Sequence, residues 1–293
     1  MVVLLERIGR VAPLGIRFHD ASTGAAIPGG LEVIAYPQVA PIQQRTAFAN
    51  ASGVYVLQNL AGMREFEFGE GDDAFWSSPP SAQHYIVEVT DLRGRYLSCQ
   101  FEADVPTRRL FDLPCLPVES PPADPAQSVP LFPSAARSTT GGRAVIRASL
   151  YDPALDRPAQ WALLAIHYEG RLLARSVSDV RGSVMLDFPY PEPIIFLPES
   201  PLTSGIALTA QQWTLQINAA YTPPPGDAER FDLCALLGAP PATLWSVWDD
   251  PAGVTPMSEA ALNFGKEAIL RTRDADSGLL LSQLFVTATG SPP

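Results

Sequence analysis

A chain of 293 residues, 46% of them hydrophobic, is long enough for about two domains of ~150 residues with packed cores. Its 30 prolines, about twice the usual share of ~5%, disfavour helices and central strands and predict many loops and short strands. The formal net charge of −11 argues against a protein that coats nucleic acid or an anionic membrane, because both tasks need a basic surface.

The chain begins with an apolar arm at residues 1–12, which contains Val2, Val3, Leu4 and Leu5. These four apolar residues are too few for the ~7–15-residue core of a secretion signal, and no run reaches the ~18 residues that span a bilayer. We therefore expect synthesis and assembly in the cytoplasm, with release only as part of an extracellular particle. The arm either completes a sheet in its own domain or adds an edge strand to a neighbouring subunit.

Residues 13–117 predict a first β-sandwich domain, because segments typical of strands alternate with turn-forming residues. The clearest predicted strands are 15–19, 31–36, 84–90 and 95–101. A long irregular segment at 61–83 interrupts them. Its acidic run at 65–73 lacks the alternating pattern of a calcium loop, and we interpret it as a solvated loop rather than a cation site.

A tight turn that feeds a strand is the most specific feature of this first domain. It lies at 48–57, in the sequence Phe-Ala-Asn-Ala-Ser-Gly-Val-Tyr-Val-Leu. The side chain of Asn50 can bond back to the backbone, and Gly53 can adopt positive φ without steric cost. The residues that follow alternate between the two faces of an extended segment.

The same turn pattern returns in the second half of the chain at 178–186, where Asp179 and Gly182 occupy the two key positions. A weaker copy lies at 91–97. Because the pattern occurs in both halves, we interpret it as a shared folding device that sets strand register, and not as a binding site.

A proline-rich stretch at 118–135 predicts an extended, semi-rigid linker between the halves. Residues 136–293 predict a second β-sandwich with the same order of strand, Asp-containing loop, strand and turn. Within it, 232–237 and 258–264 are the only plausible short helices. Residues 267–287 predict a closing hairpin.

Together these elements favour an all-β fold with two transthyretin- or immunoglobulin-like β-sandwiches in tandem, the second with a C-terminal elaboration and one or two short helices. The unit of strand, Asp-containing loop, strand and Asp/Asn-x-x-Gly turn resembles carboxypeptidase-regulatory-like or transthyretin-like modules over 13–60 and 143–190. Such modules carry no catalytic residues, so the resemblance implies an accessory, adhesive or structural role. The tandem layout is also similar to that of proteins encoded with phage-tail-like contractile injection systems.

The histidines do not form a predicted metal or catalytic site. His19, His84 and His167 lie in or beside strands, and none has a second His or Cys at ligand spacing. We interpret them as structural residues, and we expect neither a cofactor nor a catalytic group.

The cysteines do not predict a disulfide framework either. Cys99, Cys115 and Cys234 are odd in number and widely spaced, and no Cys-x-x-Cys pair occurs. We interpret all of them as buried apolar thiols.

Aromatic residues on loops are candidates for a contact surface. Phe75 and Trp76 precede a Ser-Ser-Pro-Pro sequence, and Trp245 and Trp248 precede Asp-Asp-Pro. Trp and Phe are enriched at interface anchors, so these side chains either pack under their own loops or contact a partner. With the apolar arm, they form the predicted interface.

The sequence therefore predicts a non-enzymatic structural subunit of a multiprotein assembly, most specifically a cap or adaptor component of a phage-tail-like contractile injection system. We expect protein partners such as sheath, tube or cap subunits and a homo-oligomeric ring, without nucleic acid or membrane insertion. The alternative is a free adhesive module that binds carbohydrate or protein through its aromatic loops.

Overall fold

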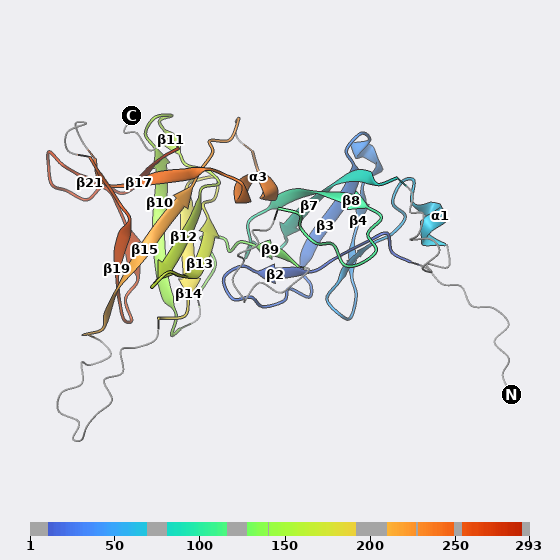
Figure 1. Cartoon of the computed structure of the whole chain (residues 1–293), viewed down its shortest axis with the longest axis horizontal. Coiled ribbons are helices and arrows are strands. Elements are labelled where there is room, and N and C mark those ends of the chain that lie inside the picture. The colour runs from blue at the N-terminus through green and yellow to red at the C-terminus, as the bar shows by residue number, and fades with distance from the viewer. Residues whose placement is uncertain are drawn as a thin grey trace, which may run out of the picture.

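The computed structural model describes residues 11–68, 81–115, 128–139, 141–191, 210–226, 228–248 and 254–288. Strands dominate, and the α-helices among these residues are the short α1 (Arg64–Glu67) and α3 (Leu233–Leu237). The structure confirms the all-β prediction. Figure 1 shows the N-terminal strands on one side of the molecule and the C-terminal strands on the other, with β9 and α3 near the middle.

The N-terminal sandwich encloses one core between two sets of strands. One set contains β1 (Leu14–Ile16), β6 (Tyr55–Leu57) and β5 (Phe48–Ala49), continued by β2 (Phe18–Asp20), which pairs in parallel with β9 (Val129–Leu131). The other set has the order β16 (Phe231–Asp232), β8 (Cys99–Val105), β7 (Gln83–Asp91), β3 (Leu31–Pro37) and β4 (Arg45–Thr46). A single turn of 3-10 helix, η1 (Pro41–Gln43), joins β3 to β4. Buried residues alternate with half-buried or exposed ones along β7 and β8, as expected for strands with one face on a core.

The C-terminal sandwich has a second, separate core. Its first strand, β10 (Ala144–Asp152), pairs with β11 (Arg157–Pro158), β14 (Ser183–Phe188), β20 (Ala268–Leu270) and β22 (Leu284–Thr287). The other sheet contains β13 (Arg171–Val177), β12 (Leu163–Tyr168), β15 (Gln212–Ala220) and β19 (Glu259–Asn263). Strand β17 (Pro241–Trp248) joins the two sheets, because it pairs with β15 and β22, and it also pairs with β18 (Thr255–Pro256) and β21 (Arg273–Asp274).

The two sandwiches have two features of strand pairing in common. In each, the turn motif leads into a strand that pairs antiparallel with the first strand: β6 with β1, and β14 with β10. In each, a later strand also pairs in parallel with an early one: β9 with β2, and β22 with β10.

The predicted helix at 258–264 is wrong, because this segment is the strand β19. Exposed residues alternate there with the fully buried Leu262, and the segment pairs along its whole length with β15. Tertiary pairing has therefore overridden a helical composition. The predicted helix at 232–237 is confirmed as α3, whose N-cap Asp232 accepts a bond from the N–H of Ala235 at 2.7 Å.

The expected linker is described only in part. Its residues 128–135 lie against the N-terminal sandwich, where Leu131 and Phe132 are buried in the core. The rest of the expected linker, 118–127, lies outside the described residues. The predicted closing hairpin at 267–287 forms at its tip, where Arg273 pairs with Leu280, but β20 and β22 each pair with β10.

Candidate functional site: the junction between the two sandwiches

The turn at Asn50 has the predicted geometry. Its side-chain Oδ1 accepts bonds from the N–H groups of Ser52 at 2.9 Å and Val54 at 3.0 Å. The N–H of Gly53 donates to the carbonyl oxygen of Asn50, and Gly53 has a φ of 72°. The Asn50 side chain thus accepts hydrogen bonds from backbone N–H groups that the tight turn would otherwise leave without a partner.

The turn at Asp179 repeats this pattern. Its Oδ1 accepts bonds from Arg181 at 2.8 Å and Ser183 at 2.9 Å, and Gly182 has a φ of 76°. The weaker copy at Asp91 also forms, with bonds from residues two and four positions later. The side-chain bonds of the three copies therefore serve the fold.

The two strong copies also share a tertiary contact. A Cβ added to Gly53 would lie 3.2 Å from Cα and Cβ of Pro28, and one added to Gly182 would lie 3.3 Å from Cβ of Pro158. Pro28 and Pro158 belong to the Asp-containing loops that the repeat aligns. The turn glycine in each half therefore lies directly beneath its own loop proline.

Of the predicted interface residues, the structure describes Trp245 and Trp248. Val2, Val3, Leu4, Leu5, Phe75 and Trp76 lie outside the described residues. Trp245 is only 4% exposed, and its Nε1 donates to Oγ1 of Thr287 at 3.1 Å. Trp248 packs edge-on against Trp245 and Phe285, at 6.0 and 5.1 Å between ring centroids. Trp245 therefore packs inside the protein and offers no contact surface, while Trp248 is half-buried.

The histidines are dispersed. His19 is fully buried, with Nδ1 2.6 Å from Oγ of Ser128. His84 lies on the surface with Nδ1 2.6 Å from a carboxylate oxygen of Asp104. Burial lowers the pKa of His167. Among the described residues, no three His, Cys, Asp or Glu side chains are arranged to hold a metal ion.

The acidic run at 65–73 is described only as far as residue 68. Within it, Glu67 is 1% exposed and its Oε1 accepts a bond from the N–H of Leu60 at 3.2 Å. This carboxylate stabilises its own loop. Glu65 is exposed on α1, and Glu70, Asp72 and Asp73 lie outside the described part of the chain.

The largest group of contacts described here lies where the C-terminal half of the chain joins the N-terminal sheet. Between β15 and β17 the chain leaves its own sandwich and inserts β16 beside β8, with Phe231 opposite Cys99 and Asp232 opposite Gln100. Helix α3 follows at once, and Leu233 and Leu236 are buried in the N-terminal core. The C-terminal half of the chain thus supplies an edge strand to the sheet of the N-terminal sandwich.

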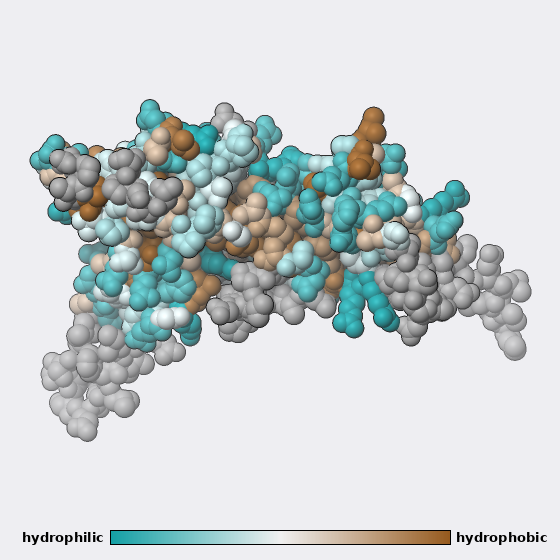
Figure 2. Space-filling model, turned by 45° about the horizontal axis from the view of Figure 1, so that its top comes forward, coloured by the Kyte–Doolittle hydropathy of each residue, from teal (hydrophilic) through white to brown (hydrophobic). Residues whose placement is uncertain are grey.

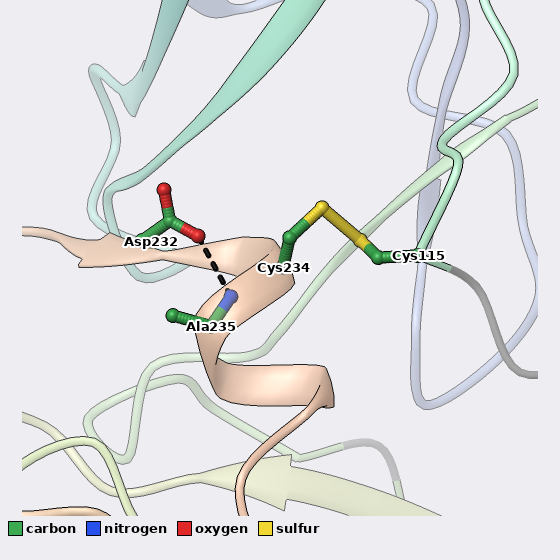
Figure 3. The surroundings of a disulfide bond; sticks show 4 residues. All are labelled: Cys115, Asp232, Cys234 and Ala235. Carbon is green, nitrogen blue, oxygen red and sulfur yellow. Dashed lines mark hydrogen bonds between the residues drawn. A yellow bond between two sulfur atoms is a disulfide. The ribbon is translucent and has the colours of Figure 1, made fainter.

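A disulfide closes this junction. Figure 3 shows Cys234, on the first turn of α3, bonded to Cys115, with the capped N-terminus of the helix beside it. The expectation of free buried thiols is therefore wrong for these two residues and correct for Cys99, which is free and fully buried. Burial raises the pKa of the Cys99 thiol to about 12, so it stays protonated and unreactive at neutral pH.

Aromatic packing reinforces the junction. The ring of Phe231 lies 6.3 Å from that of Phe132 and 5.3 Å from that of Trp161, measured between centroids. All three residues are less than 10% exposed. They come from β16, from the segment after β9, and from the turn before β12, so three chain segments meet in one cluster.

Charged groups complete the junction. Arg230 pairs with Glu88, and Arg143, which pairs with Asp187 at 2.6 Å, also donates to the carbonyl oxygen of Ser22 at 3.2 Å. These contacts tie side chains of the C-terminal half to the N-terminal sandwich.

Asp20 anchors the segment that connects the two sandwiches. Burial tends to raise the pKa of Asp20, but hydrogen bonds from Ser22 and Arg137 outweigh it and hold the pKa below its ordinary value. Tyr96 donates to the same carboxylate at 3.1 Å, and burial together with the charge of Asp20 raises the pKa of Tyr96 to about 12. The carboxylate is therefore ionised and fully engaged at neutral pH, which suits a structural role.

Comparison with known proteins gives only remote likeness. No family model matches the chain, and no curated protein matches it. Among solved structures, the Bacillus anthracis TIE protein matches with a TM-score of 0.24 and 9% identity over 94% of this chain, which spans 34% of that protein. The shaft pilin SpaA of Lactobacillus rhamnosus GG matches with a TM-score of 0.22 and 12% identity, covering 96% of this chain and 99% of the pilin. At these values the likeness assigns neither a family nor a function.

No helix in the described part of the chain is long and apolar enough to cross a membrane.

Proposed function

We propose that this chain is a non-enzymatic structural subunit of a multiprotein assembly. The observation that carries the proposal is the junction, where two sandwiches share a strand, a disulfide and an aromatic cluster. Linked domains usually move relative to each other unless a large apolar interface holds them. A junction of this kind suits a protein that must keep its shape under contact with neighbours.

The finer proposal is a cap or adaptor component of a phage-tail-like contractile injection system, with sheath, tube or cap proteins as partners in a ring. It is supported by the tandem sandwich layout of the sequence. The disulfide favours an oxidising environment for the mature protein, because such bonds persist mainly outside the reducing cytosol. Release in an extracellular particle is consistent with that chemistry.

The test is to purify the native chain from its own cells and identify the proteins that co-purify in fixed ratio. We expect subunits of a large particle. Recovery of the chain alone, as a stable monomer at every step, would contradict an assembly role. Saturable binding in a glycan panel would then favour the free adhesive module.

A further inference from the structure

The disulfide of the junction lies where a thiol in solution can reach it. Cys115, which follows β8 in the chain, and Cys234 on α3 are both half-buried rather than buried. Figure 2 shows pale-brown hydrophobic surface near the middle of the molecule, where Figure 1 places α3 and β9. Access of this kind is one of the conditions for exchange between a disulfide and a thiol.

The segment that carries Cys234 is held only in part by its own burial. We call residues 229–238, which contain β16 and α3, the insert. Three of its ten residues, Phe231, Leu233 and Leu236, are buried in the N-terminal core. Ordering two backbone residues costs about as much free energy as burying one large apolar side chain gains. Burial therefore offsets the ordering of only about six residues of the insert.

Two further contacts stabilise the insert weakly. Strand β16 pairs with β8 through only two residues, Phe231 and Asp232. The ion pair of Arg230 with Glu88 is partly exposed to solvent, and such pairs contribute little to stability. The disulfide is the covalent link that keeps the insert beside Cys115, so it decides whether the insert stays on the sheet.

A free thiol lies next to the insert. Cys99 is opposite Phe231 in the register of β8 and β16, and it is 0% exposed. It shares the N-terminal core with Leu233 and Leu236. Burial raises the pKa of the Cys99 thiol, and the negative charge of Asp232 adds to the rise, so the insert lies close to this thiol. The insert is thus the cover over Cys99 at this edge of the sheet.

We propose that the Cys115–Cys234 disulfide is a redox clasp, whose reduction by a dithiol releases the insert from β8 and exposes Cys99. A thiolate of the dithiol attacks one cysteine sulfur, the S–S bond breaks, and a mixed disulfide forms. The second thiol of the dithiol then displaces that cysteine and closes a cyclic disulfide. Two electrons and two protons pass from the dithiol to Cys115 and Cys234. The inference goes beyond the proposed function and does not depend on it.

The clasp makes the junction depend on the redox state of the surroundings. In the oxidised chain the insert completes the N-terminal sheet and brings Phe231 against Trp161. In the reduced chain the sheet ends at β8, and this aromatic contact is lost. The two sandwiches are therefore joined less tightly when the disulfide is open.

The test measures how fast N-ethylmaleimide modifies Cys99 in the full chain without denaturant. The chain is treated with dithiothreitol or left oxidised, freed of reductant under nitrogen, and then exposed to the reagent. Mass spectrometry follows the tryptic peptide 96–108, which contains Cys99 and no other cysteine. We expect reduction to raise the rate of modification at least about tenfold, which corresponds to an opening that is easier by ~1.4 kcal/mol.

Two controls separate release of the insert from unfolding of the whole chain. A variant with both Cys115→Ser and Cys234→Ser lacks the clasp, so its Cys99 should react at the faster rate with or without dithiothreitol. Low concentrations of urea should change that rate little, because local opening exposes far less surface than global unfolding.

Three outcomes overturn the inference. The first is a disulfide that stays intact in dithiothreitol. The second is a Cys99 that stays as unreactive in the reduced chain or in the double variant as in the oxidised chain. The third is a rate of modification that rises with urea as steeply as global unfolding does.

Discussion

The three copies of the Asx turn allow one substitution to be made in three environments. Gly53, Gly94 and Gly182 have φ values of 72°, 65° and 76°, so alanine meets nearly the same backbone strain at each. That strain costs about 1 kcal/mol. The surroundings differ: an added Cβ would meet nothing within 4 Å at Gly94, Pro28 at 3.2 Å at Gly53, and the carbonyl oxygen of Leu150 at 2.2 Å at Gly182.

We therefore expect Gly94→Ala to destabilise the protein by about 1 kcal/mol, and Gly53→Ala by somewhat more. Gly182→Ala should cost about 3 kcal/mol or more, because backbone must move to relieve the contact. The measurement is the free energy of unfolding of each variant in urea, with circular dichroism as the probe. Equal losses for the three variants would refute the reasoning, since strain alone would then explain them.

Three further predictions concern the junction. Cys234→Ser opens a covalent loop that spans 119 positions, and the chain entropy regained by the unfolded state should lower the free energy of unfolding by about 5 kcal/mol. The unmodified chain in reductant should lose the same amount. An unchanged urea midpoint would contradict the prediction. Phe231→Ala should lower the free energy of unfolding in urea by about 3–5 kcal/mol. It should also raise the rate of proteolysis between the sandwiches, and an unaltered rate would count against a shared core. Asp20 has a lowered pKa when folded, so the unfolded chain binds more protons, and stability should fall as pH drops below the ordinary carboxyl value of 3.8. Asp20→Asn should flatten that part of the pH profile, and an unchanged slope would refute the role of Asp20.

Local sequence patterns predicted much of the fold. The alternating segments 31–36 and 84–90 correspond to β3 and β7, because one buried face imposes a period of two on each strand. The turns at Asn50 and Asp179 were also predictable, because their hydrogen bonds join residues at most four positions apart. Segment 258–264 was mispredicted because its pairing with β15 depends on a distant strand.

The candidate site was less accessible to sequence reasoning. The cysteine pair is separated by 119 positions, and no spacing rule identifies partners at that distance. The insertion of β16 beside β8 is likewise a contact between remote segments. Trp245 was predicted as a surface candidate because it precedes a loop with proline. In the structure it is buried, and its indole N–H donates to Thr287.

The disulfide has a mechanical consequence for a protein under tension. A pull applied to the two ends of the chain passes from Cys115 through the sulfur atoms to Cys234, so the covalent path between the ends bypasses the segment between them. That segment includes β10, β12, β13, β14 and β15, which make up most of the C-terminal core strands. Reduction would place the segment back in the path of the force, and its 119 positions would add roughly 400 Å of extensible length. The oxidised chain would lengthen under force far less than its residue count implies.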